Sequence, residues 1–354
     1  MGKKLFDYVI GNPPYNENFE NSGDNGNFAK PVYNQFMDAV DGIAEKVELI
    51  HPARFLFNAG STPKAWNEKM LNDPHFKILS YEADSSKVFS NTDIKGGVAI
   101  SYRSVNEDFG AIGTFTAFSE LNSIIKKIKS VKAESLSEIV SGRGVYRLSD
   151  KALKEFPKIE QLQSNGHKKD VGSGAFRVLD KVVFFKEKPD DGYEYVKFLG
   201  LTSNKRVYHY GRKVFIDCPD NFYKYKVFIP KSNGSGALGE VLSTPLIGEP
   251  LIGEPLIGAT ETFLSVGSFE TLFEAEACLK YIKSKFARVM LGVLKVTQDN
   301  TKSKWKYVPL QDFTPSSDID WSKSVHEIDL QLYRKYGLDE DEINFIETHV
   351  KEMT

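Results

Sequence analysis

Short apolar runs alternate with amphipathic segments over the first hundred residues. Runs of apolar and β-branched residues predict four strands, at residues 6–10, 47–50, 76–81 and 98–102. Between them, residues 31–44 and 63–71 carry apolar side chains at helical spacing, and Pro31 suits the first turn of a helix. Strands that alternate with helices predict an α/β fold built on an open sheet.

The pattern changes after about residue 107. Residues 120–129 predict a helix, short aromatic-rich strands follow, and residues 260–266 and 272–292 predict a strand and one long helix. Two further short helices are expected, one ending near Gly337 and one starting after Leu338. We therefore expect an α/β domain over 1–107, an α+β domain over 108–316 and a helical tail over 317–354.

A pentapeptide repeat occupies residues 245–259, where Pro-Leu-Ile-Gly-Glu occurs twice and Pro-Leu-Ile-Gly-Ala follows. A period of five fits neither a helix nor a strand and is too short for a solenoid unit. The repeat is therefore interpreted as an expanded loop.

Composition narrows the class of protein. The chain has 354 residues and a formal net charge of −2, so a nucleic-acid surface would have to come from local clusters of charge. Cys218 and Cys278 are too few for a disulfide framework, and no spacing of His or Cys suits a metal, so a reduced cytoplasmic setting is expected. No apolar run approaches membrane-spanning length, which predicts no contact with a membrane.

The first strand ends at Gly11-Asn-Pro-Pro-Tyr15. Consecutive prolines remove two N–H donors, so the carbonyls of this turn are left for whatever occupies the cleft. The Asn12 side-chain oxygen and the Pro13 carbonyl, held by Pro14, could grip the two hydrogens of an exocyclic adenine amino group. Tyr15 could stack on a base turned out of the duplex. The alternative interpretation is an ordinary turn after a strand.

This tetrapeptide resembles the Asn-Pro-Pro-Tyr motif of N6-adenine DNA methyltransferases. The resemblance implies a doubly wound, Rossmann-like sheet, S-adenosylmethionine as the methyl donor and Asn12, Pro13, Pro14 and Tyr15 as the catalytic residues. It also implies that Phe89, which lies before Ile94-Lys-Gly-Gly97, packs on the other face of the flipped base. A core role for Phe89 is the alternative, and similar tetrapeptides occur in methyltransferases for protein or RNA nitrogens.

Later segments extend the resemblance to the methylases of restriction–modification systems. Residues 304–314, and 319–324 with the stretch up to Phe345, look like the part of those enzymes in which a target-recognition domain follows the catalytic domain. The family places a Gly-rich cofactor turn before the Asn-Pro-Pro-Tyr strand, whereas only eleven residues precede Asn12 here. We therefore expect a truncated or split enzyme whose first strand is an open edge that pairs with a second chain carrying the cofactor-binding half.

Two windows are basic enough to contact DNA. Residues 181–231 contain eleven Lys or Arg against six Asp or Glu, and residues 279–306 contain eight against one. Interleaved cations and aromatic rings suit phosphate and base contacts. The predicted DNA-binding residues are Lys205, Arg206, Tyr208, Tyr210, Arg212, Lys213, Lys302, Lys304 and Lys306. The alternative is a β-rich domain with core aromatics and solvated lysines.

Three functions follow in order of support. The first is a DNA adenine-N6 methyltransferase acting on double-stranded DNA, and the second is a non-catalytic DNA-recognition module or relic. The third is a methyltransferase for protein or RNA nitrogens. His51 is interpreted as structural, because no carboxylate nearby would orient it as a general base.

Overall fold

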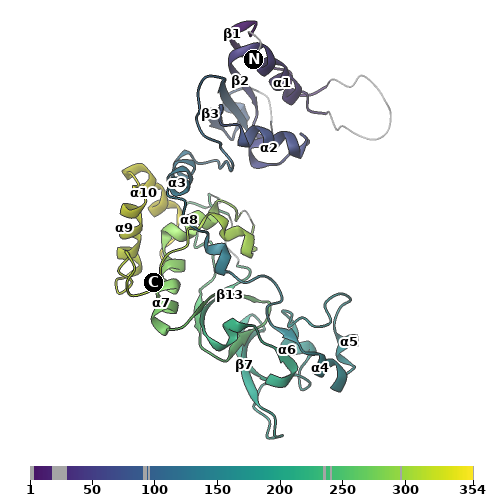
Figure 1. Cartoon of the computed structure of the whole chain (residues 1–354). Helices are drawn as coiled ribbons and strands as arrows, with labels where there is room; N and C mark the ends of the chain where they lie inside the picture. Colours follow the sequence, from purple (N-terminus) through teal and green to yellow (C-terminus); the bar gives the residue numbers. More distant parts are fainter. Residues whose placement is uncertain are drawn as a thin grey trace, which may run out of the picture. The chain divides into compact units, whose positions relative to one another are not determined.

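The computed structural model describes residues 4–17, 30–90, 94, 96–233, 237–239, 241–295 and 297–353. Most of the expected loop at 16–30, together with Lys95 and residues 234–236, lies outside these ranges. The chain divides into two compact units, residues 1–122 and 123–354, and the boundary falls within helix α3 (Figure 1). Each unit is described by itself. The domain limits expected from the sequence stay predictions.

Unit 1 contains every strand and helix expected in the first hundred residues. Its elements are β1 (Phe6–Gly11), α1 (Tyr33–Ile43), β2 (Ala44–Pro52), the 3₁₀ turn η1 (Arg54–Phe57), α2 (Lys64–Asn72), β3 (Phe76–Glu82), the 3₁₀ turn η2 (Ser85–Lys87) and β4 (Val98–Ser104). The α/β class is confirmed for this part of the chain.

The four strands of unit 1 form one mixed sheet in the order β1-β2-β4-β3. β1 runs parallel to β2, with Val9 beside Val47 and Gly11 beside Leu49, and β4 is antiparallel to both of its neighbours. β1 is therefore an edge strand within the described residues. Because β1 and β2 are parallel, their carboxyl ends lie at the same edge of the sheet.

Only one face of this sheet has a core. Val9, Val47 and Leu49 pack on that face with Met37 of α1 and Trp66 of α2. Side chains alternate across a strand, so Phe6, Tyr8 and Ile10 point to the other face, where each is exposed and Ile10 is 73% exposed. Burial of such a side chain contributes roughly 1.5–3 kcal/mol, a stabilisation that these three side chains do not fully gain within the described residues.

Unit 2 contains small sheets and short helices. Its helices are α3 (Ser119–Ser130, shared with unit 1), α4 (Asp150–Glu155), α5 (Ile159–Leu162), α6 (Ala175–Val178), α7 (Leu272–Lys283), α8 (Lys285–Gly292), α9 (Val325–Lys335) and α10 (Glu340–His349). Its strands are β5 (Arg147–Leu148), β6 (Phe184–Phe185), β7 (Tyr195–Thr202), β8 (Lys205–Arg212), β9 (Ile216–Asp217), β10 (Tyr225–Pro230), β11 (Leu251–Gly253), β12 (Ile257–Ala259) and β13 (Phe263–Phe269). Four 3₁₀ turns complete the list: η3 (Leu136–Ile139), η4 (Lys213–Phe215), η5 (Asp220–Tyr223) and η6 (Lys302–Tyr307).

Three sheets organise unit 2. They have the strand orders β12-β7-β8-β6, β11-β10-β13 and β5-β9. β7 and β8 form an antiparallel hairpin whose tip, at Ser203 and Asn204, projects from the unit (Figure 1). Phe184, Phe198, Phe222 and Phe228 are fully buried beneath these sheets, so many of the aromatic residues of this region form its core.

The pentapeptide repeat is not a loop, and that prediction is wrong. Its second copy contains β11, which pairs with β10, and its third contains β12, which pairs in parallel with β7. The glycines of these two copies explain how short strands can form within a five-residue period. A Cβ on Gly253 would lie 2.5 Å from the Phe228 ring, and one on Gly258 would lie 2.5 Å from the Phe198 ring. The second and third copies thus bring their backbones against a core phenylalanine, where only glycine fits, whereas Gly248 of the first copy packs on Pro230.

The helix expected over residues 272–292 is two helices, so its continuity was predicted wrongly. Ser284 has an extended backbone (φ −60°, ψ 145°) that ends α7, and its side chain accepts a hydrogen bond from the amide of Ala287 at 3.1 Å to begin α8. Apolar spacing continues through the break, which is why periodicity did not reveal it. Serine prefers such a capping position to a helix interior.

His51, near the end of β2, is a core residue, as its structural interpretation expected. Its ring is completely buried, with Nε2 2.8 Å from the Ser101 hydroxyl oxygen and Nδ1 3.1 Å from the Pro52 carbonyl oxygen. Burial disfavours the charged ring and lowers the pKa of His51 to about 4.

This burial predicts acid sensitivity. The unfolded chain takes up the His51 proton near pH 6.5 and the folded chain only near pH 4, so this contribution to stability is complete above pH 6.5 and is lost as the pH falls towards 4. Between pH 7 and pH 4 the unfolding free energy of the wild type should fall by roughly 3 kcal/mol more than that of His51→Gln. Urea titrations with ¹⁹F-labelled tryptophan can follow Trp66 of unit 1 separately. Equal pH dependence in both proteins would contradict the prediction.

Candidate functional site

The Asn12–Tyr15 turn follows β1 directly, at the edge of the sheet where β2 also ends. Pro13 is buried, whereas Asn12 and Pro14 are exposed. No hydrogen bond occupies the Asn12 side chain within the described residues. The amide of Val32 donates to the Tyr15 carbonyl at 3.0 Å, and this bond ties the turn to the start of α1. The arrangement holds the backbone and leaves the Asn12 amide free to accept from a ligand.

Tyr15 is partly buried against the core of unit 1, and burial raises the pKa of its hydroxyl to about 12. Its ring meets Phe89 edge-on, with centroids 6.4 Å apart and planes at 67°. The structure thus brings together the two aromatics that the sequence paired. A base between two parallel rings needs roughly 7 Å, twice a carbon–carbon contact. Phe89 would therefore have to rotate to admit one.

A cation and two glycines lie at the ends of β2 and β4. Arg54 is exposed and follows β2 after one residue. Gly96 packs on it so closely that a Cβ would lie 2.3 Å from the Arg54 Cγ, and the Gly97 carbonyl accepts from the Ala53 amide at 3.0 Å. Arg54 is not among the site residues predicted from the sequence. The feature that could have indicated it is its position immediately before a turn rich in aromatic residues. An exposed guanidinium at this edge can bind a phosphate.

The predicted DNA-binding residues of the β8 region do not share one environment. Lys205, Arg206 and Tyr208 are exposed on β8, and Tyr210 is half-buried. An Arg206 N–H donates to the Glu249 carbonyl, and Lys213 forms an ion pair with Glu194 at 2.9 Å. The exposed group therefore consists of three residues near the tip of the β7–β8 hairpin.

Arg212 lies in an aromatic enclosure. Its guanidinium donates to Asp191 Oδ2 at 2.7 Å and to the Tyr195 hydroxyl at 3.0 Å, and it lies over the rings of Phe185 and Tyr193. These contacts raise its pKa despite partial burial. The side chain is engaged in holding β7 to β8, so we do not include it in the exposed basic group.

The second basic window is also largely used inside unit 2. Lys280 donates to two carbonyls, Lys283 and Lys285 form ion pairs with Glu249 and Glu347, and Arg288 is fully buried. Lys302 and Lys306 remain exposed on the 3₁₀ turn η6, and Lys304 is half-buried there. This turn is held in place by the buried indole of Trp305.

Other kinds of site are not found in the part of the chain that the structure describes. No three His, Cys, Asp or Glu side chains gather there to hold a metal ion. Cys218 and Cys278 are free thiols, and burial raises the pKa of Cys218 to about 11. Within the same residues no helix has the length and apolar content needed to cross a membrane.

Residues 1–89 match the Eco57I restriction-modification methylase family. An uncharacterized adenine-specific methylase of Mycoplasma pneumoniae is 32% identical over 99 residues, which are 28% of this chain and 23% of that relative. These matches confirm the resemblance to restriction–modification adenine methylases, and the family match contains the Asn12–Tyr15 turn. The family implies S-adenosylmethionine as the methyl donor. Because the match spans less than a quarter of the relative, it does not establish the activity of this chain.

Two solved structures of restriction–modification proteins resemble the chain weakly. The type IIG restriction endonuclease BpuSI has a TM-score of 0.33 and 9% identity, covering 90% of this chain and 48% of that one. The type IIL restriction-modification enzyme MmeI, solved in complex with DNA, has a TM-score of 0.35 and 12% identity, covering 90% and 51%. Likeness at this level does not establish a common fold.

Gly97 and Gly110 allow a matched test of local packing. Gly97 and Gly110 have nearly the same backbone, with φ of +76° and +74°, but a Cβ on Gly97 would lie 2.3 Å from the Glu82 carbonyl oxygen while one on Gly110 would meet nothing. Gly110→Ala should cost about 1–2 kcal/mol for the left-handed backbone alone, and Gly97→Ala should cost about 1–3 kcal/mol more because of the clash. Urea unfolding of both variants measures the difference. Equal costs would show that the Gly97 contact does not constrain the turn.

Proposed function

We propose that this chain supplies the base-binding part of a DNA adenine-N6 methyltransferase of a restriction–modification system. One observation carries the proposal: Asn12–Tyr15 ends an edge strand with the Asn12 amide unoccupied and with Tyr15 opposed by Phe89. The match of residues 1–89 to a methylase family supports it. A methyltransferase for protein or RNA nitrogens would not require the large second unit with its exposed basic hairpin.

The residues of the turn have distinct roles in this proposal. Asn12 Oδ1 and the Pro13 carbonyl accept the two hydrogens of adenine N6, which draws the nitrogen towards tetrahedral geometry and frees its lone pair for attack. Tyr15 and Phe89 hold the flipped base by stacking. No covalent nucleophile and no strong base are needed, which agrees with the burial of His51. Arg54 can hold a phosphate beside the flipped nucleotide.

The described residues do not form a complete site for S-adenosylmethionine. When bound, this cofactor supplies an electrophilic methyl group, and the family holds it with a Gly-rich turn on a strand beside the Asn-Pro-Pro-Tyr strand. Among the described residues no strand pairs with the free side of β1, and its face bearing Phe6 and Ile10 is exposed. We propose that a polypeptide carrying the cofactor turn adds a strand to this edge and completes a doubly wound sheet.

Double-stranded DNA is the proposed partner of the second unit. Lys205, Arg206 and Tyr208 near the hairpin tip, with Lys302 and Lys306 on η6, offer cations for phosphates and one exposed ring. The internal engagement of Arg212 and of the α7 and α8 cations leaves this smaller group as the contact surface.

Replacement of Asn12 tests the chemistry. Asn12→Ala removes one acceptor for the N6 hydrogens and should lower methyl transfer to mixed-sequence DNA by about 100-fold or more, with DNA binding unchanged. Asn106→Ala, which changes an exposed asparagine in the same unit, is the control. Transfer of label from S-adenosylmethionine is measured with the chain alone and with the product of the upstream gene. Full activity of Asn12→Ala would refute the assigned role, and DNA binding without transfer in either mixture would favour a recognition relic.

A lysine on the open edge tests the proposed partner. Ile10→Lys places a charge where a strand and a covering helix should dock, so it should weaken association with the upstream product about tenfold or more. Leu79→Lys is the matched control, because Leu79 is also exposed but lies on β3 at the opposite edge of the sheet. Association is measured by analytical ultracentrifugation. Equal effects of the two lysines, or methyl transfer by the chain alone, would refute completion at β1.

A further inference from the structure

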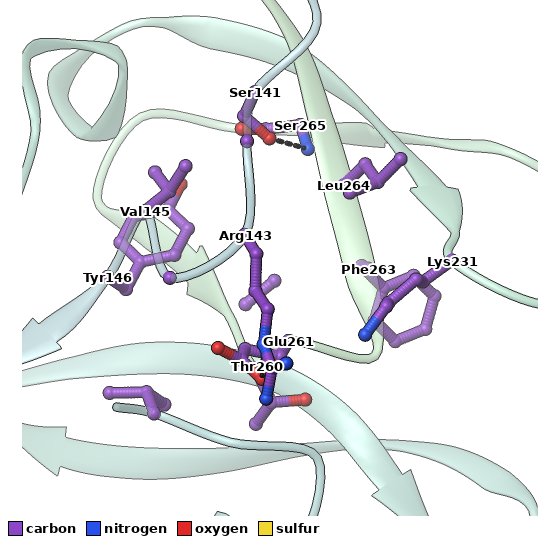
Figure 2. A pocket seen from close by; sticks show the side chains of 14 residues that line it. Ser141, Arg143, Val145, Tyr146, Lys231, Thr260, Glu261, Phe263, Leu264 and Ser265 are labelled. Carbon is purple, nitrogen blue, oxygen red and sulfur yellow. Dashed lines mark hydrogen bonds and ion pairs between the residues drawn. The ribbon is translucent and has the colours of Figure 1, made fainter. Parts of the chain in front are cut away.

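A pocket in unit 2 lies apart from the methylase turn. Its walls are the loop at residues 141–146, which precedes β5, and residues 259–265, which join β12 to β13 (Figure 2). The Ser141 hydroxyl oxygen accepts from the Ser265 amide at 2.9 Å and joins the two walls at one end. At the other end the side chain of Arg143 extends over Glu261, and Lys231 lies at the side (Figure 2).

Glu261 is a buried carboxylate of which one oxygen accepts a hydrogen bond and the other does not. The side chain is 5% exposed, Oε2 accepts from Arg143 Nε at 3.0 Å, and Oε1 has no partner within the described residues. Its backbone is fixed, because the Glu261 amide donates to the Val171 carbonyl and the Thr260 amide donates to the Leu199 carbonyl. An unpaired carboxylate oxygen in such a place is costly. The fold nevertheless holds it rigidly.

Arg143 is exposed, whereas Glu261 is buried. Its side chain is 60% exposed, and it uses only Nε on the carboxylate, so the two Nη groups are free within the described residues. The loop that carries it has Gly142 and Gly144 on either side, and Gly144 has a φ of +70°. An outward rotation of Arg143 would open the Glu261 side of the pocket. The pocket then offers a fixed acceptor beside a set of fork-shaped donors.

The pocket adjoins the proposed DNA surface. Arg206 of β8 lies over the ring of Phe263, a residue of the pocket wall, with its guanidinium carbon 5.7 Å from the ring centroid. Lys231, also in the pocket wall, has no partner for its ammonium group within the described residues. Cations that can hold a phosphate backbone therefore stand beside an acceptor and donor pair, which is the arrangement that base reading requires.

From this geometry we propose that Glu261 and Arg143 read one C·G base pair of the DNA, an inference that rests on the proposed function. In the major groove cytosine presents an N4 amino donor, and the guanine paired with it presents the O6 and N7 acceptors. Glu261 Oε1 accepts from cytosine N4, and the Arg143 fork donates to guanine. The pair determines sequence specificity and has no part in methyl transfer.

Selection of bound duplexes from a randomised library, followed by sequencing, tests the assignment without any need for methyl transfer. The wild type should select cytosine at one position, and Glu261→Gln should shift that position towards adenine, since glutamine pairs with adenine N6 and N7. Discrimination at that position should fall roughly 10- to 100-fold, with the other positions unchanged. Arg143→Gln, an exposed change that spares the fold, should relax the same position, and the double variant should add little to either single change.

Glu270→Gln is the control, because Glu270 is an exposed acid in an ion pair with Lys224 elsewhere in unit 2. The assignment is overturned if Glu261→Gln leaves every preference unchanged, if it weakens all sequences equally, or if the wild type selects adenine or binds no DNA. Absence of methyl transfer by the wild type, with the shift in preference intact, would instead count against the proposed catalytic role of Asn12–Tyr15 and leave this inference standing.

Discussion

The parallel pairing of β1 with β2 is the constraint on which the candidate site depends. It fixes Gly11 beside Leu49, so the turn after β1 and the segment after β2 leave the sheet at the same edge. Asn12 and Arg54 therefore follow strands that end at the same edge, although about 40 residues separate them in the chain. On its other side β1 has no paired strand among the residues that the structure describes. The strand that carries the Asn12–Tyr15 turn is thus also the edge strand of the sheet.

Local patterns were sufficient to predict the strands and helices of unit 1 and its α/β class. Its strands are short apolar runs, its helices have clear apolar faces, and each is bounded by turn residues such as the Asn12–Pro14 turn. The pairing of Tyr15 with Phe89 came from a family resemblance, since no spacing rule connects positions so far apart. In unit 2 the same sequence rules predicted the wrong elements at places where tertiary contacts determine the local structure. The glycines of the repeat form strands because Phe198 and Phe228 lie beneath them, and Ser284 divides a helix that its apolar spacing would continue.

Charge counts were the weakest guide to the DNA surface. A window of sequence records that a lysine is present but not whether its ammonium group is already engaged. Lys226 illustrates the point: its side chain is fully buried, and the three N–H donors of its ammonium group are shared among four backbone carbonyls that lie 3.0–3.1 Å away, in and near η5 and in the repeat. Arg212 and Arg288 are similar, and burial lowers the pKa of Arg288 to about 10. Cations of this kind stabilise turns and helix junctions. The net charge of a sequence window therefore overestimates the number of cations that can contact a phosphate.

An incomplete contact can be more informative than a charged cluster. The ion pair of Arg143 and Glu261 joins residues that are 118 positions apart, so no motif reveals it. If it served stability alone, full pairing of both carboxylate oxygens would be favoured, because an unpaired buried acceptor costs about 1–3 kcal/mol. The fold instead fixes Glu261 by its backbone and leaves Arg143 exposed between two glycines. A buried acceptor under an exposed donor is poorly suited to holding two walls together. It suits a surface on which the contact between Arg143 and Glu261 is replaced by contacts to a bound ligand.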